Sequence, residues 1–338
     1  TMKVIPKGQV VTAKTHLIYG ESQAGKTTLI GKLARDLHKR TGQSTRLIMS
    51  DQGGFSAIKP EIDEGIIQVV DMVGDTLPQS NLMWLAKGYM PGAEGVINTA
   101  AQDLDGIGMV VLDSLSSAAA SVLDYFAATG MKVSQEVVGL RQEQGLNFGN
   151  PAQSHYGAVQ NFMLQLITQF AALPVKRVVF TALESKGSDT VDGQLVLGPL
   201  VAGKALTGVI PSRINRIFHL ELAAGADKSK RAYRIYFRPH LDPMLGKYWP
   251  ANLRLPLEMI AAMDGSPKYG KGYLDFTTGE ELLELLDYCD SYTAPKPEVM
   301  ELMASLGSNP AVPPAATLAP KSGTTSATRG PIVVNNRK

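Results

Sequence analysis

The sequence predicts an α/β fold: a mostly parallel sheet flanked by helices, then an antiparallel hairpin and a disordered C-terminal tail. Three observations predict it. Short apolar segments alternate with helical patterns over most of the 338 residues. A glycine-rich loop joins the first apolar segment to the first helical one, and a later apolar run, residues 108–113, ends in an aspartate. From residue 291 the composition changes to Pro, Ala, Ser and Thr, which bury too little apolar surface to fold.

The glycine-rich loop carries the most specific pattern. Residues 17–19 form a short apolar strand, residues 28–38 have helical spacing, and residues 20–27 between them (GESQAGKT) match the phosphate-binding P-loop. Its glycines let backbone amides point at one anion, and the start of the helix adds the positive end of its dipole. The pattern predicts that these residues bind the phosphates of ATP: Gly20, Ser22, Gln23, Ala24, Gly25, Lys26, Thr27 and Thr28. Lys26 is expected to reach the β- and γ-phosphates, and the Thr27 hydroxyl to ligate Mg²⁺.

The second strand is expected over residues 45–50 and is followed by Asp51 and Gln52. Ligands of open α/β sheets bind at the carboxyl ends of the strands, so both side chains are placed to face the γ-phosphate or its attacking water. The alternative is that they only make a turn before Gly53 and Gly54.

A second acidic position, Asp113, ends the apolar run at 108–113. Four apolar residues that end in Asp113 form the Walker B pattern, in which a buried strand brings one carboxylate to Mg²⁺. A further buried strand over 176–183 brings Thr181 and Glu184 to the same edge of the sheet. We expect Lys26, Asp113, Glu184, and Asp51 or Gln52 to take part in catalysis, with Thr27 and Asp113 as the metal ligands.

The remaining elements follow from periodicity and from breakers. A third strand is expected at 65–72, and strands of a hairpin at 214–222 and 231–237. Helices are expected at 77–89, 98–104, 118–128, 155–173 and 279–288, and two long loops at 129–154 and 185–210. The domain boundaries that follow are a core at 1–258, a small helical extension at 259–290, and a flexible tail at 291–338.

Composition limits the remaining possibilities. The net charge of +2 gives no global field for nucleic acid, and 44% hydrophobic residues suffice for a sizeable core. The single cysteine, Cys289, excludes an intramolecular disulfide and cannot build a zinc site, which suits a reducing compartment. No apolar run reaches the roughly 18 residues of a membrane span, and the first residues lack the core of a signal peptide. We therefore expect a cytoplasmic protein without membrane contact.

Four segments together carry a family resemblance: GESQAGKTT, VVLDSLSS, VVFTALESKG and GPLVAGKALTGVIPSRINRIFHLEL. They occur in the order found in RecA-core ATPases, and they resemble most the phage nucleotide-binding proteins of that class, including the Sak-type single-strand-annealing ATPases. The resemblance covers residues 13–240. It implies a RecA-like P-loop ATPase that uses ATP and Mg²⁺, binds single-stranded DNA, assembles as a filament or ring, and serves phage-type recombination, annealing or replication.

The resemblance also assigns roles to single residues. Lys26, Thr27 and Asp113 match the phosphate lysine, the magnesium hydroxyl and the Walker B acid. Thr181 and Glu184 fall near the sensor position. The loop at 185–210, with Lys186 and Lys204, takes the place of the second DNA-binding loop, and the loop at 129–154 that of the first. The candidates for basic residues that complete a neighbouring subunit's site are Lys204, Lys230 and Arg234.

One position departs from the family pattern. RecA-like proteins place a glutamate after the second strand to polarise the attacking water, and here Asp51 or Gln52 stands in its place. Glutamine can orient water but is a poor base, so slow hydrolysis is expected. Two alternatives stay open: a non-enzymatic, ATP-dependent switch or assembly factor that gates a protein partner through the tail, and a small-molecule kinase. The kinase is disfavoured because no arginine cluster follows the P-loop.

Overall fold

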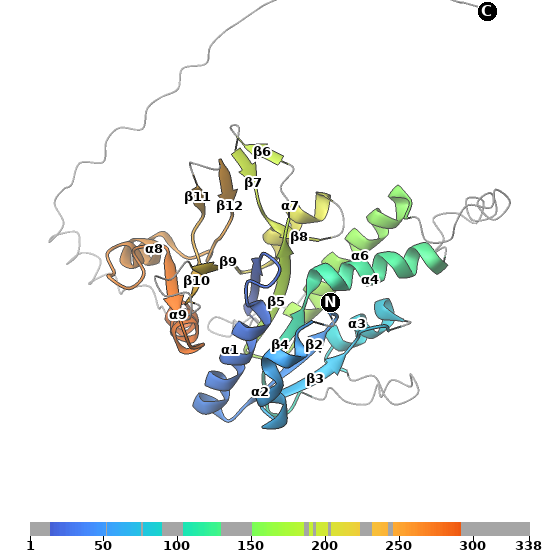
Figure 1. Ribbon diagram of the computed structural model, residues 1–338, viewed down its shortest axis with the longest axis horizontal. Helices are drawn as coiled ribbons and strands as arrows, with labels where there is room; N and C mark the ends of the chain where they lie inside the picture. The colour runs from blue at the N-terminus through green and yellow to red at the C-terminus, as the bar shows by residue number, and fades with distance from the viewer. Residues whose placement is uncertain are drawn as a thin grey trace, which may run out of the picture. The chain divides into compact units, whose positions relative to one another are not determined.

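A nine-stranded sheet forms the centre of the molecule (Figure 1). The computed structural model describes residues 14–51, 53–75, 77–89, 104–129, 151–185, 189–191, 194–201, 204–223, 232–242 and 246–291. Along one path the strand order is β13-β10-β9-β1-β5-β4-β2-β3, and β8 pairs with β5. The strands are β1 (Lys14–Gly20), β2 (Ser44–Met49), β3 (Ile67–Asp71), β4 (Ile107–Asp113), β5 (Arg177–Glu184), β8 (Pro199–Leu200), β9 (Arg216–Ala223), β10 (Ala232–Tyr236) and β13 (Tyr273–Phe276).

The central six strands, from β9 to β3, are parallel, whereas β8, β10 and β13 pair antiparallel. The expected mostly parallel sheet, flanked by helices and followed by an antiparallel hairpin, is confirmed. The hairpin is β9 and β10. Because the six strands are parallel, their carboxyl ends meet at one edge of the sheet.

Helices cover both faces of the sheet because the buried strands are apolar on both sides. In β1, Leu17 and Tyr19 belong to one core cluster and Ile18 to the other, as the two-residue period of a strand requires. On the first face pack α3 (Pro78–Ala86), α4 (Leu115–Thr129), α6 (Gln153–Ala171) and α7 (Lys204–Arg213). On the other pack α1 (Lys26–Thr41), α2 (Lys59–Asp63), α8 (Leu257–Asp264) and α9 (Glu280–Ser291), together with the 3₁₀ helix η1 (Phe55–Ile58).

The prediction of a long loop over 185–210 is wrong in part. It contains β6 (Asp189–Val191), β7 (Gln194–Val196), β8 and most of α7. The strands β6 and β7 join β11 (His240–Asp242) and β12 (Lys247–Trp249) in a second sheet of order β11-β12-β7-β6. Figure 1 shows this small sheet above β9, and His240 of β11 stacks on His219 in the middle of β9.

The segment 259–290 also differs from the expected helical extension. Its strand β13 pairs with β10 in the main sheet, and its helix α9 packs on α1. All the described elements belong to one compact unit. Parts of several expectations lie outside the described residues: the first 13 residues of the expected core, the helix at 98–104 apart from its last residue, most of the loop at 129–154, and the tail beyond residue 291.

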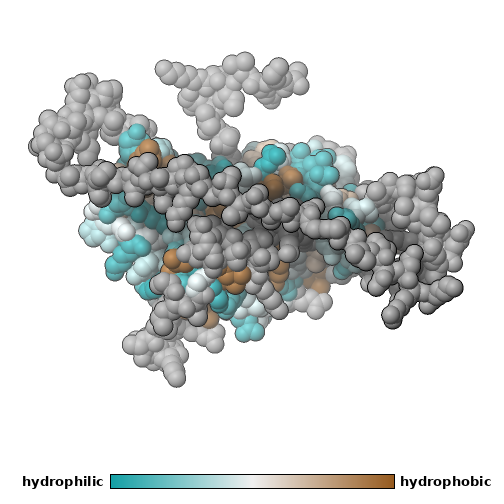
Figure 2. All heavy atoms as spheres, turned by 90° about the horizontal axis from the view of Figure 1, so that it is seen from above, coloured by the Kyte–Doolittle hydropathy of each residue, from teal (hydrophilic) through white to brown (hydrophobic). Residues whose placement is uncertain are grey.

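The visible described surface mixes hydrophilic and hydrophobic residues (Figure 2). Exposed large apolar side chains include Leu257, which is 80% exposed, and Leu77, Leu222 and Leu241. Within the described ranges, no helix combines the length and the apolar character that a membrane crossing requires.

Candidate functional site

The loop between β1 and α1 curls tightly enough to surround an anion. Gln23 and Gly25 have φ angles of 65° and 90°, and Gly25 directly precedes α1. Gly20 has no room for a side chain, since a Cβ there would lie 2.2 Å from the carbonyl oxygen of Leu220 on β9. The two glycines of the motif are therefore required for different reasons: Gly20 because the backbone of β9 approaches it closely, and Gly25 because its conformation is left-handed.

Lys26, the first residue of α1, folds its side chain back onto this loop. It is 8% exposed, and its Nζ donates hydrogen bonds to the carbonyl oxygens of Gly20 (2.9 Å) and Glu21 (2.7 Å). Burial lowers the pKa of Lys26, and the carboxylates of Asp113, Glu184 and Asp51 oppose that shift. The ammonium group of Lys26 and the amides at the start of α1 lie side by side, and together they can bind a phosphate group.

The carboxylate of Asp113 is held from two sides. Thr27 Oγ1 donates to Asp113 Oδ2 over 2.6 Å, and Thr181 Oγ1 on β5 donates to Asp113 Oδ1. Asp113 is 5% exposed and Thr181 is fully buried. The peptide between Asp113 and Ser114 is cis. One hydroxyl and one carboxylate oxygen side by side are the hard oxygen donors that Mg²⁺ takes, so Thr27 and Asp113 fit this ion, which would neutralise phosphate charge.

A cavity of about 400 Å³ brings the predicted phosphate residues together. It is lined by Ser22, Gln23, Gly25, Lys26, Thr27, Thr28, Met49, Asp51, Gly53, Gly54, Ala57, Asp113, Ser114 and Leu183. Of the predicted residues, Gly20 and Ala24 belong to the loop but not to the lining. Asp51 is exposed, and its Oδ1 accepts a hydrogen bond from the backbone N–H of Gly53.

The remaining predicted residues lie elsewhere. Glu184 Oε2 lies 2.9 Å from His219 Nε2 and lines a neighbouring cavity of about 550 Å³. Arg234 forms a two-bond ion pair with Asp275 and lies over the ring of Tyr273. Lys204 begins α7, and nothing is described of its side chain; Gln52, Lys186 and Lys230 lie outside the described residues.

Two contributions were missed from the sequence. Gly54 completes the wall opposite Thr27, where a Cβ would lie 2.9 Å from Thr27 Cγ2. Tyr233 of β10 covers Gly25, since a Cβ there would lie 2.2 Å from Tyr233 Cε1. The paired glycines at 53–54 are a signal for the first. Tyr233 is brought to the loop only by the pairing of β10 with β9, and nothing in the sequence signals it.

The loop, the buried lysine and the Thr27–Asp113 pair, set at the carboxyl edge of a parallel sheet, define a P-loop nucleoside triphosphatase. A comparison with family models agrees: the model of the AAA domain family matches residues 12–214, and the chain belongs to this family. A search of curated proteins finds no match. Among solved structures, a KaiC-like protein from the hyperthermophilic archaeon Pyrococcus horikoshii OT3 is similar at 12% identity, with 66% of this chain and 77% of that chain covered and a TM-score of 0.36.

Proposed function

We propose that the protein binds Mg²⁺-ATP in the cavity beside Lys26 and hydrolyses it. The contact between Thr27 and Asp113 carries this proposal, because it joins the two expected metal ligands from opposite sides of the phosphate site. Lys26 would neutralise the β- and γ-phosphates, and the loop amides would hold the anion. Asp51 is the other carboxylate that lines the cavity besides Asp113, and we assign it the role of orienting the attacking water.

We further propose that single-stranded DNA stimulates this hydrolysis, and that the chain assembles as a filament or ring in phage-type recombination, annealing or replication. This finer proposal is supported by the four sequence segments that resemble RecA-core ATPases of the Sak-type group. Lys186 and Lys204 are the candidate DNA contacts, and Lys204, Lys230 and Arg234 the candidates to complete a neighbouring site.

The first experiment measures phosphate release from Mg²⁺-ATP with and without single-stranded DNA. Lys26→Ala should lower the rate roughly a hundredfold or more, the scale for losing one preorganised donor to developing charge. Lys39→Ala is the matched control, because its side chain is 68% exposed and pairs with Asp36 at the far end of α1. Equal rates in parent and Lys26→Ala would refute the ATPase. A rate unchanged by DNA would refute the stimulation alone.

DNA binding is measured separately, by filter binding over a range of salt concentrations with and without ATP. Contacts to phosphates release counterions, so the affinity should fall steeply as salt increases. An affinity independent of salt would contradict a role for the lysines.

A second candidate function is an ATP-dependent switch that gates a protein partner through the tail. This candidate is favoured by the contact between Glu184 and His219. The contact occupies one of the three carboxylates near Lys26, so fewer carboxylates remain to activate water for hydrolysis. Bound ATP that stays intact for hours within a stable partner complex would select the switch over the ATPase. Rapid turnover of the same bound ATP would exclude it.

A further inference from the structure

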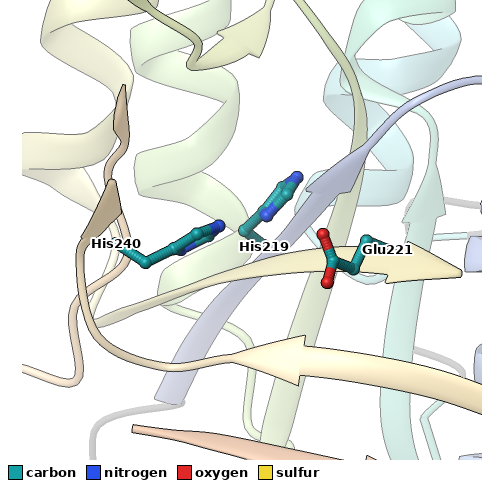
Figure 3. A group of neighbouring side chains, drawn as sticks. All are labelled: His219, Glu221 and His240. Carbon is teal, nitrogen blue, oxygen red and sulfur yellow. The ribbon is translucent and has the colours of Figure 1, made fainter. Parts of the chain in front are cut away.

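A cluster of two imidazoles and a carboxylate lies beside the phosphate site. His219 and Glu221 are two residues apart on β9 and so share one face of the strand, and His240 comes from β11 of the small sheet. One ligand atom from each residue lies within 4.8 Å of the other two. Figure 3 shows His219 between His240 and Glu221, with the three polar groups next to one another.

The hydrogen bonds around His219 leave one of its nitrogens unsatisfied. The ring is 3% exposed, and its Nε2 faces the Glu184 carboxylate at 2.9 Å, so this nitrogen carries the proton. Nδ1 then has a lone pair, and it is buried without a hydrogen-bond partner among the described residues. A buried acceptor without a donor is costly, and the nearby carboxylate of Glu221 is an acceptor as well. A cation between them would satisfy both.

The surroundings resemble the support of a metal site. A ligating histidine usually donates its other N–H to a carboxylate, as His219 does to Glu184. A ligating carboxylate is itself usually hydrogen-bonded, and Tyr236 Oη donates to Glu221 Oε1 over 2.7 Å. Both ring nitrogens of His240 are buried and make no hydrogen bond of ordinary geometry within the described residues. Its ring is stacked between Tyr236 and Trp249, which fixes its orientation.

We propose that His219, Glu221 and His240 bind one divalent transition-metal ion of the zinc class. Two imidazoles and a carboxylate suit Zn²⁺ better than Mg²⁺, which prefers oxygen ligands. Tetrahedral metal–ligand bonds of roughly 2.0–2.2 Å place the ligand atoms roughly 3.3–3.6 Å apart. Atoms that now lie within 4.8 Å of one another would therefore have to approach by at most about 1.5 Å. Cysteine takes no part in this site.

The ion would join parts of the fold that are separate in sequence. His219 pairs with Tyr19 of β1, one residue before the P-loop begins, and with Tyr236 of β10. His240 belongs to the small sheet. The neighbouring cavity of about 550 Å³ is lined by Glu21, Ser22 and Gln23 as well as by His219 and Glu221. A three-ligand ion there fixes the small sheet beside the loop and keeps a position open toward this cavity.

The test uses the full chain, stripped of metal with a chelator and titrated with Zn²⁺ by calorimetry and with Co²⁺ by visible absorption. The expected result is one equivalent per chain, and a Co²⁺ spectrum of a site with nitrogen ligands. Glu221→Gln and His240→Ala should lose this binding at least tenfold. His38→Asn is the matched control, because His38 lies in the last turn of α1, contacts the Gln43 carbonyl oxygen and is not part of the cluster. Glu184→Gln and Tyr236→Phe, which leave all three ligands in place, should weaken binding by roughly 10- to 100-fold.

Each outcome decides the proposal. The absence of stoichiometric binding in the parent would overturn it. Equal affinity in Glu221→Gln, His240→Ala and His38→Asn would overturn it too, because the ion would then lie elsewhere. Lys26→Ala should keep Zn²⁺ binding, so failure of the nucleotide site and failure of the metal site are distinguished.

Discussion

Thr181→Val tests whether the orientation of the Asp113 carboxylate matters to the phosphate site. The change replaces a hydroxyl by a methyl group of similar size at a fully buried position, so it leaves no cavity. It removes the donor to Asp113 Oδ1, while Thr27 continues to donate to Oδ2. A hydrogen bond to a charged group contributes about 1.5–3 kcal/mol. At about 1.4 kcal/mol for each tenfold change, this is roughly a 10- to 150-fold effect.

The assay is the Mg²⁺ dependence of ATP hydrolysis at saturating ATP, beside the free energy of unfolding from urea titration. We expect Thr181→Val to need a higher Mg²⁺ concentration for the half-maximal rate or to have a lower maximal rate. The two changes together should amount to the roughly 10- to 150-fold effect given above. Thr181→Ser keeps the hydroxyl and should restore the parent's Mg²⁺ dependence. The reasoning is refuted if Thr181→Val matches the parent in Mg²⁺ dependence, in maximal rate and in stability.

Two other predictions concern buried titratable groups. His16 is 1% exposed, and burial together with the nearby Arg216 and Arg177 lowers its pKa well below the ordinary value. The unfolded chain therefore binds the proton first, so stability is full above about pH 6.5 and falls below it, by up to about 1.4 kcal/mol per pH unit for one proton. His16→Phe should flatten this part of the stability curve, and a slope identical to the parent's in urea titrations would contradict the assignment. Burial raises the pKa of Cys289 to about 11, so its thiol should react with a disulfide reagent at pH 8 much more slowly than in urea. Equal rates in both would show that the thiol is accessible in the folded chain.

The main sheet could be predicted because its strands are long apolar runs bounded by breakers. The run at 108–113 became β4 (Ile107–Asp113), and the run at 176–183 became β5 (Arg177–Glu184). The strands β6, β7, β11, β12 and β13 have three or four paired residues each and no detectable period, so only their pairing in space defines them. Helix α7 contains Gly208, one of the glycines that predicted a loop, but it packs against α6, and Ile210 is fully buried there.

The proximity of Thr27 and Asp113 was predictable for a geometric reason. The two residues are 86 apart, yet Thr27 lies in the first turn of α1 after β1, and Asp113 ends β4 at the same edge of a parallel sheet. The partner of Glu184 was not predictable. His219 reaches it because β9 lies next to β1, with Tyr19 and His219 in register, and no local pattern reveals this register.

The three carboxylates that act on Lys26 differ in their freedom to move, and this difference bears on turnover. Asp113 is buried and accepts hydrogen bonds from Thr27 and Thr181. Glu184 faces His219 at 2.9 Å, and its side chain is 8% exposed. Asp51 is exposed and bonds to the backbone of Gly53 in the next turn. A general base must come within hydrogen-bond reach of its water. Of the three, Asp51 can turn toward a bound phosphate without breaking a buried contact, so it is the carboxylate that we propose to orient the attacking water.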